Sequence, residues 1–381
     1  MAPVDAMGDN PTMTVTAPTL RSSRTFGIEE EVMLLAPDTL DPVDVADEVI
    51  AEVCDGDAVS DWVRAEFLQA QVEFSSPLLA DGDAADRVVR DFRRALQGAA
   101  DRRRLLVASV GTAFGCGRSS VAPGERYERF RHTLGAIHPD HRIQGQHVHV
   151  AVASADEGVA VMNALRPWLA PLIALTANSP CFSGADTGFA SWRTIVGRRF
   201  ATASVPPAFA DGRDYRRRIR ALLGIGTTFD TASIAWMMRL PERYPTLELR
   251  VFDAQLTADE TVAAALLTRA LVETAAAGEL PHAAAAEHHE FVDSAVWHAA
   301  RHGLDDTLVD PVTAALAPAW IVIERMLDAV GPALAATGDG PRVDALIERV
   351  RADGNGAARQ RAVLAAGQPA LARLLRDAFV A

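Results

Sequence analysis

Three segments of this chain alternate with a period of two between apolar side chains and polar or ionisable ones: residues 26–35, 143–153 and 246–252. Such alternation is typical of a β-strand with one face on the core and one face open. A fourth strand is expected over residues 62–75, where apolar and amide residues lie between two glutamates. Strands of this kind occur in antiparallel sheets that are covered on one face. The sequence therefore predicts such a sheet in the first two thirds of the chain.

The segments between these strands predict helices and one long loop. Apolar residues recur at helical spacing over residues 84–108 and 157–177. Residues 181–207 are rich in Gly, Pro, Ser and Thr, which favours a long loop of the kind that often carries function. A capping-box pattern, Thr257 with Glu260, predicts a helix that begins near residue 258, and helix alone is expected from there to the end. The expected fold is α+β, an antiparallel sheet covered by helices with a helical C-terminal part.

Length and composition indicate a globular protein. With 381 residues and 49% hydrophobic side chains, the chain can bury a large core, and a single domain is expected over residues 25–381. The first 24 residues, rich in Pro, Thr and Ser, predict a disordered arm rather than a signal peptide, because no basic start precedes an apolar run.

Charge and cysteine usage restrict the partners and the compartment. The formal net charge of -13 disfavours binding to nucleic acid, since such proteins need clustered Lys and Arg. Charged residues interrupt every long apolar stretch, so no membrane partner is expected. Cys54, Cys116 and Cys181 are widely spaced, which supports neither a disulfide framework nor a thiolate zinc site and fits the cytoplasm.

The first predicted strand carries two carboxylates on one face. Alternation places Glu29 and Glu31 together and Glu30 on the opposite face. A solvated edge strand could tolerate this pair, but on a half-buried strand the two charges repel each other unless a cation neutralises them. We therefore favour a metal-binding role for Glu29 and Glu31.

The predicted third and fourth strands add imidazoles, a carboxylate and a guanidinium. His147 and His149 share one face of a strand whose other face carries valines, so they are either core histidines or a ligand pair. Glu248 and Arg250 likewise share one face. They form either a surface ion pair or a metal ligand beside a phosphate clamp, because Arg presents a bidentate fork to phosphate.

The second predicted strand contributes Glu66 and Glu73, seven residues apart. A regular strand would put them on opposite faces. Either a bulge near Gln69 to Gln71 corrects this, which we favour, or only one of them is a ligand, in which case Glu73 is the more secure choice. Together with the other strands, five acids and one or two imidazoles would suit magnesium ions and leave coordination positions for the phosphates of a nucleotide.

These residues resemble the motifs of a known family, the carboxylate-amine ligases of the second glutamate-cysteine ligase type, which share the glutamine synthetase fold. The resemblance covers nearly all of residues 24–365. The matching blocks are Gly27-Ile-Glu-Glu-Glu31, Gln69-Ala-Gln-Val-Glu73, His147-Val-His149, Thr246-Leu-Glu-Leu-Arg250, Leu165-Arg-Pro-Trp168, Leu175-Thr-Ala-Asn-Ser-Pro180, Asp186-Thr-Gly-Phe-Ala-Ser-Trp-Arg-Thr194 and Gly354-Asn-Gly-Ala-Ala-Arg359.

The resemblance implies roles for individual residues. Arg250 would clamp the transferred phosphoryl group and, with Glu248, form the catalytic pair; Arg250 and His149 would contact the nucleotide. Arg193 would bind the carboxylate of the acid substrate, although a structural loop arginine is an equal alternative. The implied metal ligands form two sets: Glu29, His147 and Glu248 for one magnesium ion, and Glu31, Glu66 and Glu73 for another.

The implied activity is an ATP-dependent ligation that joins a carboxylate, expected to be that of glutamate, to an amine such as cysteine through an acyl phosphate. A homodimer is also implied. One departure bears on the amine: Gln144-Gly145-Gln146 stands where the family usually has Cys-Gly-Leu.

Two other functions compete with this interpretation. A zinc hydrolase of the amidohydrolase type would use the H-x-H pair with further histidines at strand ends. A catalytically inactive member of the family would act as a binding protein, but every matched acid is present. The remaining histidines disfavour the hydrolase, because they fall in helical, alanine-rich sequence: His282, His288, His289, His298 and His302.

Overall fold

The computed structural model describes residues 23–55 and 59–381. Most of the predicted N-terminal arm, residues 1–22, lies outside the described part. Its last residue, Arg24, is anchored by ion pairs to Glu157 at 2.8 Å and to Glu273 at 3.1 Å. These ion pairs hold Arg24 in place just before the first strand.

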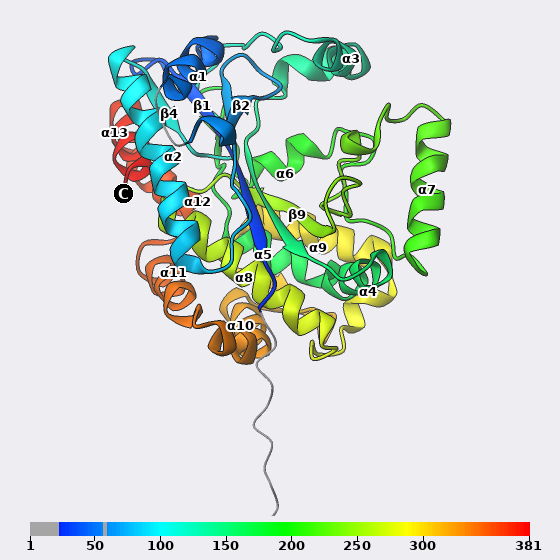
Figure 1. The fold of residues 1–381 in the computed structure, drawn as a ribbon. Helices are drawn as coiled ribbons and strands as arrows, with labels where there is room; N and C mark the ends of the chain where they lie inside the picture. The colour runs from blue at the N-terminus through cyan, green and yellow to red at the C-terminus, as the bar shows by residue number, and fades with distance from the viewer. Residues whose placement is uncertain (1–22, 56–58) are drawn as a thin grey trace, which may run out of the picture.

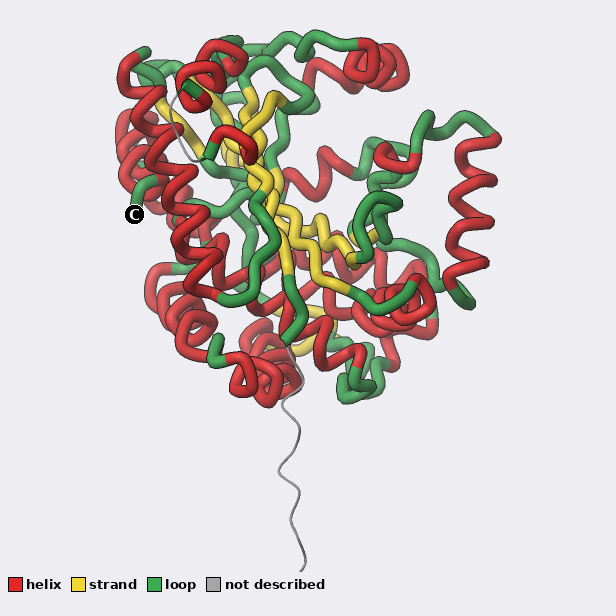
Figure 2. The backbone as a smooth tube through the Cα atoms, viewed as in Figure 1, coloured by secondary structure: helices red, strands yellow, loops and turns green. Residues whose placement is uncertain are grey.

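A seven-stranded sheet runs through the molecule, and each of its strand pairs is antiparallel (Figures 1 and 2). The strand order is β2-β3-β1-β5-β9-β8. The seventh strand, β4, pairs with the C-terminal end of β1, past the residues of β1 that pair with β5. The strands are β1 Phe26–Leu35, β2 Val63–Ala65, β3 Gln71–Ser75, β4 Leu106–Ala108, β5 Gly145–Ala151, β8 Met238–Arg239 and β9 Thr246–Asp253.

Helices lie on both sides of this sheet, and those on one side form the main core with it. In Figure 1, α2 and α13 lie to one side of the strands, and α3, α6 and α7 lie to the other. The helices are α1 Ala46–Cys54, α2 Gly82–Arg102, α3 Glu125–Leu134, α4 Ala155–Leu165, α5 Leu169–Leu175, α6 Trp192–Gly197, α7 Gly212–Gly224, α8 Ala258–Ala276, α9 His289–His302, α10 Ala319–Thr337, α11 Gly340–Asp353, α12 Gly356–Leu364 and α13 Gln368–Phe379. The predicted α+β class is confirmed.

Alternation along the strands separates a core face from an open face. The side chains of Val32, Val148 and Leu249 are completely buried against the helices. Glu30, between Glu29 and Glu31, also points to this side, where it forms a buried ion pair with Arg93 of α2. The predicted capping box at Thr257 is present at the start of α8. Glu29 and Glu31 are thereby left on the opposite, open face.

Four details of the predicted fold are wrong. The single strand over residues 62–75 is a hairpin of β2 and β3. The helix over residues 84–108 stops at Arg102; Arg104 adopts a positive φ of 57°, which ends a helix, and the apolar run that follows pairs with β1 as β4. Helical spacing alone could not separate this short strand from the helix.

The other two details concern loops and the C-terminal part. The loop predicted over residues 181–207 contains a small hairpin, β6 Cys181–Phe182 with β7 Ala185–Asp186, and the helix α6. The C-terminal part is not entirely helical, because β10 Thr307–Val309 and β11 Leu316–Pro318 pair between α9 and α10. Both hairpins are too short to show an alternating pattern.

One helical stretch of the described chain, Ala155–Leu175, is long and apolar enough to cross a membrane. Of its most apolar window, 83% is buried inside the fold. This stretch, α4 with α5, therefore forms part of the core.

Candidate active site

A cavity of about 550 Å³ lies on the open face of the sheet. Its wall includes seven of the nine side chains singled out in the sequence: Glu29, Glu31, Glu66, Glu73, His147, Arg193 and Arg250. The other two, His149 and Glu248, lie next to this wall, in contact with Glu29 and Arg250 respectively. Residues from four strands, from α6 and from the position that follows β2 therefore meet at one place.

Cross-strand register explains this meeting. Glu29 of β1 faces His147 of β5, and His149 faces Glu248 of β9. A β-bulge between Gln146 and Val148 shifts the β5–β9 register by one residue. The imidazoles of His147 and His149 consequently lie between the carboxylates of Glu29 and Glu248.

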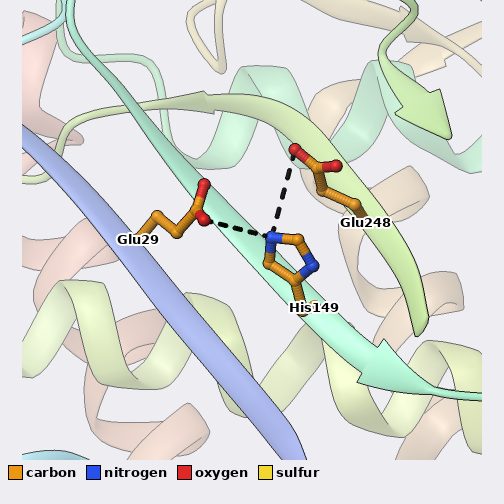
Figure 3. A group of neighbouring side chains, drawn as sticks. All are labelled: Glu29, His149 and Glu248. Atoms are coloured by element: carbon orange, nitrogen blue, oxygen red, sulfur yellow. Dashed lines mark ion pairs between the residues drawn. The ribbon is translucent and has the colours of Figure 1, made fainter. Parts of the chain in front are cut away.

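Glu29, His149 and Glu248 form the most compact group of possible metal ligands (Figure 3). One potential ligand atom from each lies within 4.8 Å of the others. The Nε2 atom of His149 is 3.5 Å from Oε1 of Glu29 and 4.0 Å from Oε1 of Glu248. This nitrogen is buried and has no hydrogen-bond partner among the described residues. Two carboxylates and an imidazole aimed at one point fit a divalent cation.

His147 occupies a position between the two acidic groups. Its Nδ1 lies 3.0 Å from Oε2 of Glu29 and 4.0 Å from Oε1 of Glu248, and its Nε2 lies 3.9 Å from Oε1 of Glu31. The resemblance assigns His147 to the ion at Glu29 and His149 to the nucleotide. In the structure His149 belongs to the compact group, while His147 lies near the same two carboxylates and on the cavity wall.

Glu31, Glu66 and Glu73 form a second acidic group. Glu31 faces Glu73 across the β1–β3 pair, and Glu66 follows the last residue of β2. Burial raises the pKa of Glu31 to about 7, and burial together with the neighbouring carboxylates raises the pKa of Glu66 and, further, that of Glu73. Three carboxylates so placed need a proton or a cation to coexist.

The hairpin of β2 and β3 explains how Glu66 and Glu73, seven residues apart, can both face the cavity. We predicted a bulge near Gln69 to Gln71, and this is wrong. The chain reverses direction between β2 and β3, so the interval from Glu66 to Glu73 crosses a turn rather than running along one strand. Both carboxylates then reach the cavity.

Two arginines hold Glu248. Nη1 of Arg250 is ion-paired with its Oε1, while Nε and Nη2 of Arg239 donate to its two oxygens at 2.5 and 3.1 Å. Although burial opposes ionisation, these charges lower the pKa of Glu248 to about 2. Arg250 also lies 3.3 Å from Nδ1 of His147. Its guanidinium thus borders both acidic groups.

Arg239 and Arg64 are site residues that the sequence did not reveal. Arg239 lies on β8, a strand of two residues, directly opposite Glu248. Arg64 lies opposite Glu73 and donates to its two oxygens at 2.9 and 3.1 Å. Neither strand is long enough to show alternation, so no pattern identified these residues in advance.

Burial and charge also set the ionisation of the first group. Burial opposes ionisation of Glu29, but the hydrogen bond with His147 and the nearby imidazole of His149 bring its pKa well below the usual range. Burial and Arg250 lower the pKa of His147 to about 4. That imidazole is therefore neutral near pH 7 and free to offer a lone pair.

Arg193 reaches the cavity from the start of α6. Its backbone N–H donates to Oγ of Ser179 at 3.0 Å, and its guanidinium donates to the carbonyl of Arg250 at 3.2 and 3.3 Å. The side chain passes directly over Gly145. Arg193 is therefore a fixed cation beside Glu31.

A buried carboxylate fixes the segment that carries Arg193. Asp253 accepts hydrogen bonds from the backbone N–H of Asn178 at 2.7 Å and from the hydroxyls of Ser179 at 2.7 Å and Ser191 at 2.9 Å. Gln360 of α12 donates to both oxygens of Asn178, at 2.7 and 3.0 Å. Gln360, the residue after the motif at Gly354, thus links α12 to the segment that Asp253 holds.

Comparison with known proteins gives one consistent result. The model of glutamate-cysteine ligase family 2 matches residues 25–376. Two relatives, both named "Putative glutamate-cysteine ligase 2-2", come from Saccharopolyspora erythraea and Frankia alni. The first is 39% identical over 365 residues, 92% of this chain and 91% of the relative. The second is 38% identical over 365 residues, 91% of this chain and 94% of the relative.

Solved structures share the fold at low sequence identity. A glutamate-cysteine ligase from Francisella tularensis in complex with AMP is similar with a TM-score of 0.66 and 10% identity over 95% of this chain and 90% of that chain. A bifunctional glutathione synthetase from Pasteurella multocida is similar with a TM-score of 0.64 and 14% identity, over 94% of this chain and 52% of that chain.

Proposed function

This chain belongs to glutamate-cysteine ligase family 2, and from that premise we propose that it is an ATP-dependent carboxylate-amine ligase that activates its acid substrate as an acyl phosphate. The proposed acid is glutamate, as the names of the relatives suggest, and the proposed metal is magnesium. A cytoplasmic location, a homodimer and a single domain over residues 25–381 stay predictions.

One observation carries the proposal: two groups of carboxylates lie side by side on one cavity wall, with an arginine between them. Glu29 and Glu31 are two residues apart on β1 and belong to different groups. The first group would hold a cation through Glu29, His149 and Glu248, and the second through Glu31, Glu66 and Glu73. Magnesium held by these residues would supply positive charge that stabilises the charge developing during phosphoryl transfer.

The chain's own part in the reaction is alignment and electrostatics. Arg193 would hold the substrate carboxylate that stays unreacted, so that the second carboxylate faces the terminal phosphate of ATP. An oxygen of that carboxylate attacks the phosphorus, the bond to ADP breaks, and an acyl phosphate results. The amine then attacks the acyl carbon, and inorganic phosphate leaves with the former carboxylate oxygen.

Arg250 would stabilise the transferred phosphoryl group. In the structure its guanidinium is held by Glu248, which Arg239 holds as well. Arg239 can keep Glu248 neutralised when Arg250 turns toward a phosphate. A planar fork suits two oxygens of a phosphoryl group better than an ammonium does.

The alternative of a zinc hydrolase gains no support from the site. His141 and His147 are the histidines among the residues that line the cavity. His298 and His302 lie on α9, where the ring of His298 is 2.8 Å from the carbonyl of Thr307. His298 and His302 therefore lie outside the cavity wall and are not available as further zinc ligands there.

An oxygen-label experiment tests the chemistry. Glutamate labelled in its side-chain carboxylate should transfer one labelled oxygen to inorganic phosphate, and the transfer should require ATP, magnesium and an amine. Label in AMP would indicate an adenylate intermediate, and product formed without cleavage of ATP would indicate a hydrolase working in reverse. Either outcome would overturn the proposal.

A further inference from the structure

An arginine and two acids lie in one row across the strands at the edge of the sheet. Arg64 of β2 is opposite Glu73 of β3, and Glu73 is opposite Glu31 of β1. All three side chains line the cavity. Side chains directly opposite each other on neighbouring strands are close enough to interact. Arg64 therefore borders the second acidic group, which consists of Glu31, Glu66 and Glu73.

The guanidinium of Arg64 engages both oxygens of Glu73. Its Nε donates to Oε2 at 2.9 Å, and its Nη2 donates to Oε1 at 3.1 Å. Nη2 also donates to Oγ of Ser75 at 2.7 Å and lies 3.8 Å from Oε1 of Glu29. Within residues 23–55 and 59–381, no other arginine forms an ion pair with the second acidic group. Arg64 is thus the arginine that balances part of its charge.

Arg64 is held much less firmly than Arg239, the arginine that donates to Glu248. Nη1 of Arg239 also donates to the carbonyl oxygens of Ala232 and Ile234, and only 14% of its side chain is exposed. The side chain of Arg64 is 53% exposed, and its partners in the described chain are side chains alone. An ion pair this exposed contributes little to stability. Arg239 is therefore fixed, whereas Arg64 is free to leave its acid.

A divalent cation and Arg64 compete for Glu73. Three carboxylates attract a doubly charged ion more strongly than they attract one guanidinium, and their hard oxygens are the ligands that magnesium prefers. Both oxygens of Glu73 already accept hydrogen bonds from Arg64, so an ion that binds them meets the guanidinium, and the two cations repel each other. The side chain of Glu73 is 9% exposed and cannot turn away, whereas that of Arg64 can turn into solvent.

We propose that Arg64 is the internal counter-ion of the second acidic group and that a divalent cation displaces it. Arg64 is a positioning residue that acts through Glu73: it holds this carboxylate in place before the ion binds, and it lowers the affinity of the group for the ion. The inference rests on the proposed function for the assignment of this group as a cation site. It goes beyond that function in predicting that loss of an arginine strengthens cation binding.

Cation binding can be measured without turnover. The full chain is treated with chelator, dialysed and titrated with manganese(II) as the probe, and the free ion is followed by electron paramagnetic resonance. Arg64→Met, which keeps an apolar stem without the charge, should bind one manganese ion roughly fivefold more tightly than wild type. The matched control is Arg126→Met, at an exposed arginine of the cavity wall that pairs with Asp230, and its affinity should stay within about twofold of wild type. Weaker or unchanged binding in Arg64→Met would overturn the inference.

The Glu73→Gln background shows where Arg64 acts. Without the carboxylate that holds Arg64, the further change Arg64→Met should alter manganese binding by less than about twofold. A gain in affinity that persists in this background would assign Arg64 to Glu29 and the first group, and would overturn the inference.

Melting temperatures separate a binding effect from a folding defect, and turnover separates the inference from the proposed function. Manganese should raise the Tm of Arg64→Met by more than it raises that of wild type. A Tm lowered equally with and without manganese would reduce Arg64 to a structural residue and overturn the inference. Release of ADP by wild type, with manganese binding unchanged in Arg64→Met, would overturn the inference and keep the ligase. Tighter manganese binding in Arg64→Met, with no release of ADP by wild type from any acceptor, would contradict the ligase and keep the inference.

Discussion

A methyl group added to Gly145 would lie 2.2 Å from Nη2 of Arg193 and 2.8 Å from its Cζ. Gly145 is the central residue of Gln144-Gly145-Gln146, the segment that departs from the usual family motif. Its N–H also donates to Oε2 of Glu31 at 2.7 Å. Because Gly145 has no side chain, the guanidinium of Arg193 can lie over it while its backbone N–H bonds to Glu31.

Gly145→Ala should therefore weaken binding of the acid substrate. The clashing atoms are the end of a flexible side chain, so the fold should tolerate the change while the guanidinium of Arg193 moves away. Losing hydrogen bonds to a charged group predicts a KM for the acid roughly tenfold to a hundredfold higher. Gly331→Ala, where an added methyl would meet nothing within 4 Å, is the matched control. An unchanged KM in Gly145→Ala would remove Arg193 from substrate binding.

Arg250→Lys should reduce turnover more than it weakens binding of the acid. Lysine keeps the charge beside Glu248 but lacks the planar fork, and loss of one well-placed donor predicts a kcat roughly a hundredfold lower. The KM for the acid should stay within about threefold of wild type. Arg325→Lys, an arginine paired with Asp310 outside the cavity wall, should behave as wild type. Steady-state kinetics decide, and equal kcat values in both variants would contradict the assigned role.

Stability should fall as pH rises when divalent metal is removed. The folded pKa of Glu31, about 7, lies above that of an unfolded glutamate, so its contribution is present at low pH and is lost as pH rises from about 4.5 to about 7. Glu73 acts in the same direction, because its pKa is also raised. In chelator, the Tm should therefore decrease from about pH 6.5 to about pH 8. Below that range His147 and His141, whose pKa values are lowered to about 4 and about 3, act in the opposite direction. Added magnesium should reverse most of the decrease at the higher pH, since it binds the ionised acids.

Glu31→Gln separates the contribution of Glu31 from that of His149. The pKa of His149 is also raised, so its contribution to stability is likewise lost as pH rises. The variant should show a flatter Tm profile in chelator. Glu52→Gln, at a half-buried acid paired with Arg102, should keep the profile of wild type. A Glu31→Gln profile as steep as that of wild type would rule out Glu31 as the source.

Much of the site could be predicted because long strands carry it. β1, β5 and β9 are seven to ten residues long, enough for alternation to show which side chains share a face. Glu29, Glu31, Arg250 and both histidines could therefore be placed together from sequence. Which of these side chains lie next to one another could not be predicted, because a bulge at Gln146 changes which residues of β5 and β9 lie opposite each other.

The parts that escaped prediction depend on distant contacts. Arg64 and Arg239 lie on strands of two or three residues whose pairing partners are fixed only by the folded sheet. The aromatic part of the cavity wall combines Phe67 with Phe130 of α3 and with Phe200. No local pattern brings these segments together, whereas tertiary packing does.

Asp253 provides the last test, because it joins the segment that leads to Arg193 to the sheet. Its oxygens accept a backbone N–H from Asn178, which cannot rotate, and two hydroxyls, which can. In Asp253→Asn the amide can keep the N–H bond with its remaining oxygen, but at least one hydroxyl must reverse its role and the charge near Arg193 is lost. We expect a loss of about 1–3 kcal/mol of stability and a higher KM for the acid, with kcat changed less. Asp310→Asn, at a buried aspartate bonded to Arg325, should cost similar stability without moving the KM. Equal kinetic effects in both variants would reduce Asp253 to a general stabiliser, whereas an effect confined to Asp253→Asn would identify it as the residue that positions Arg193.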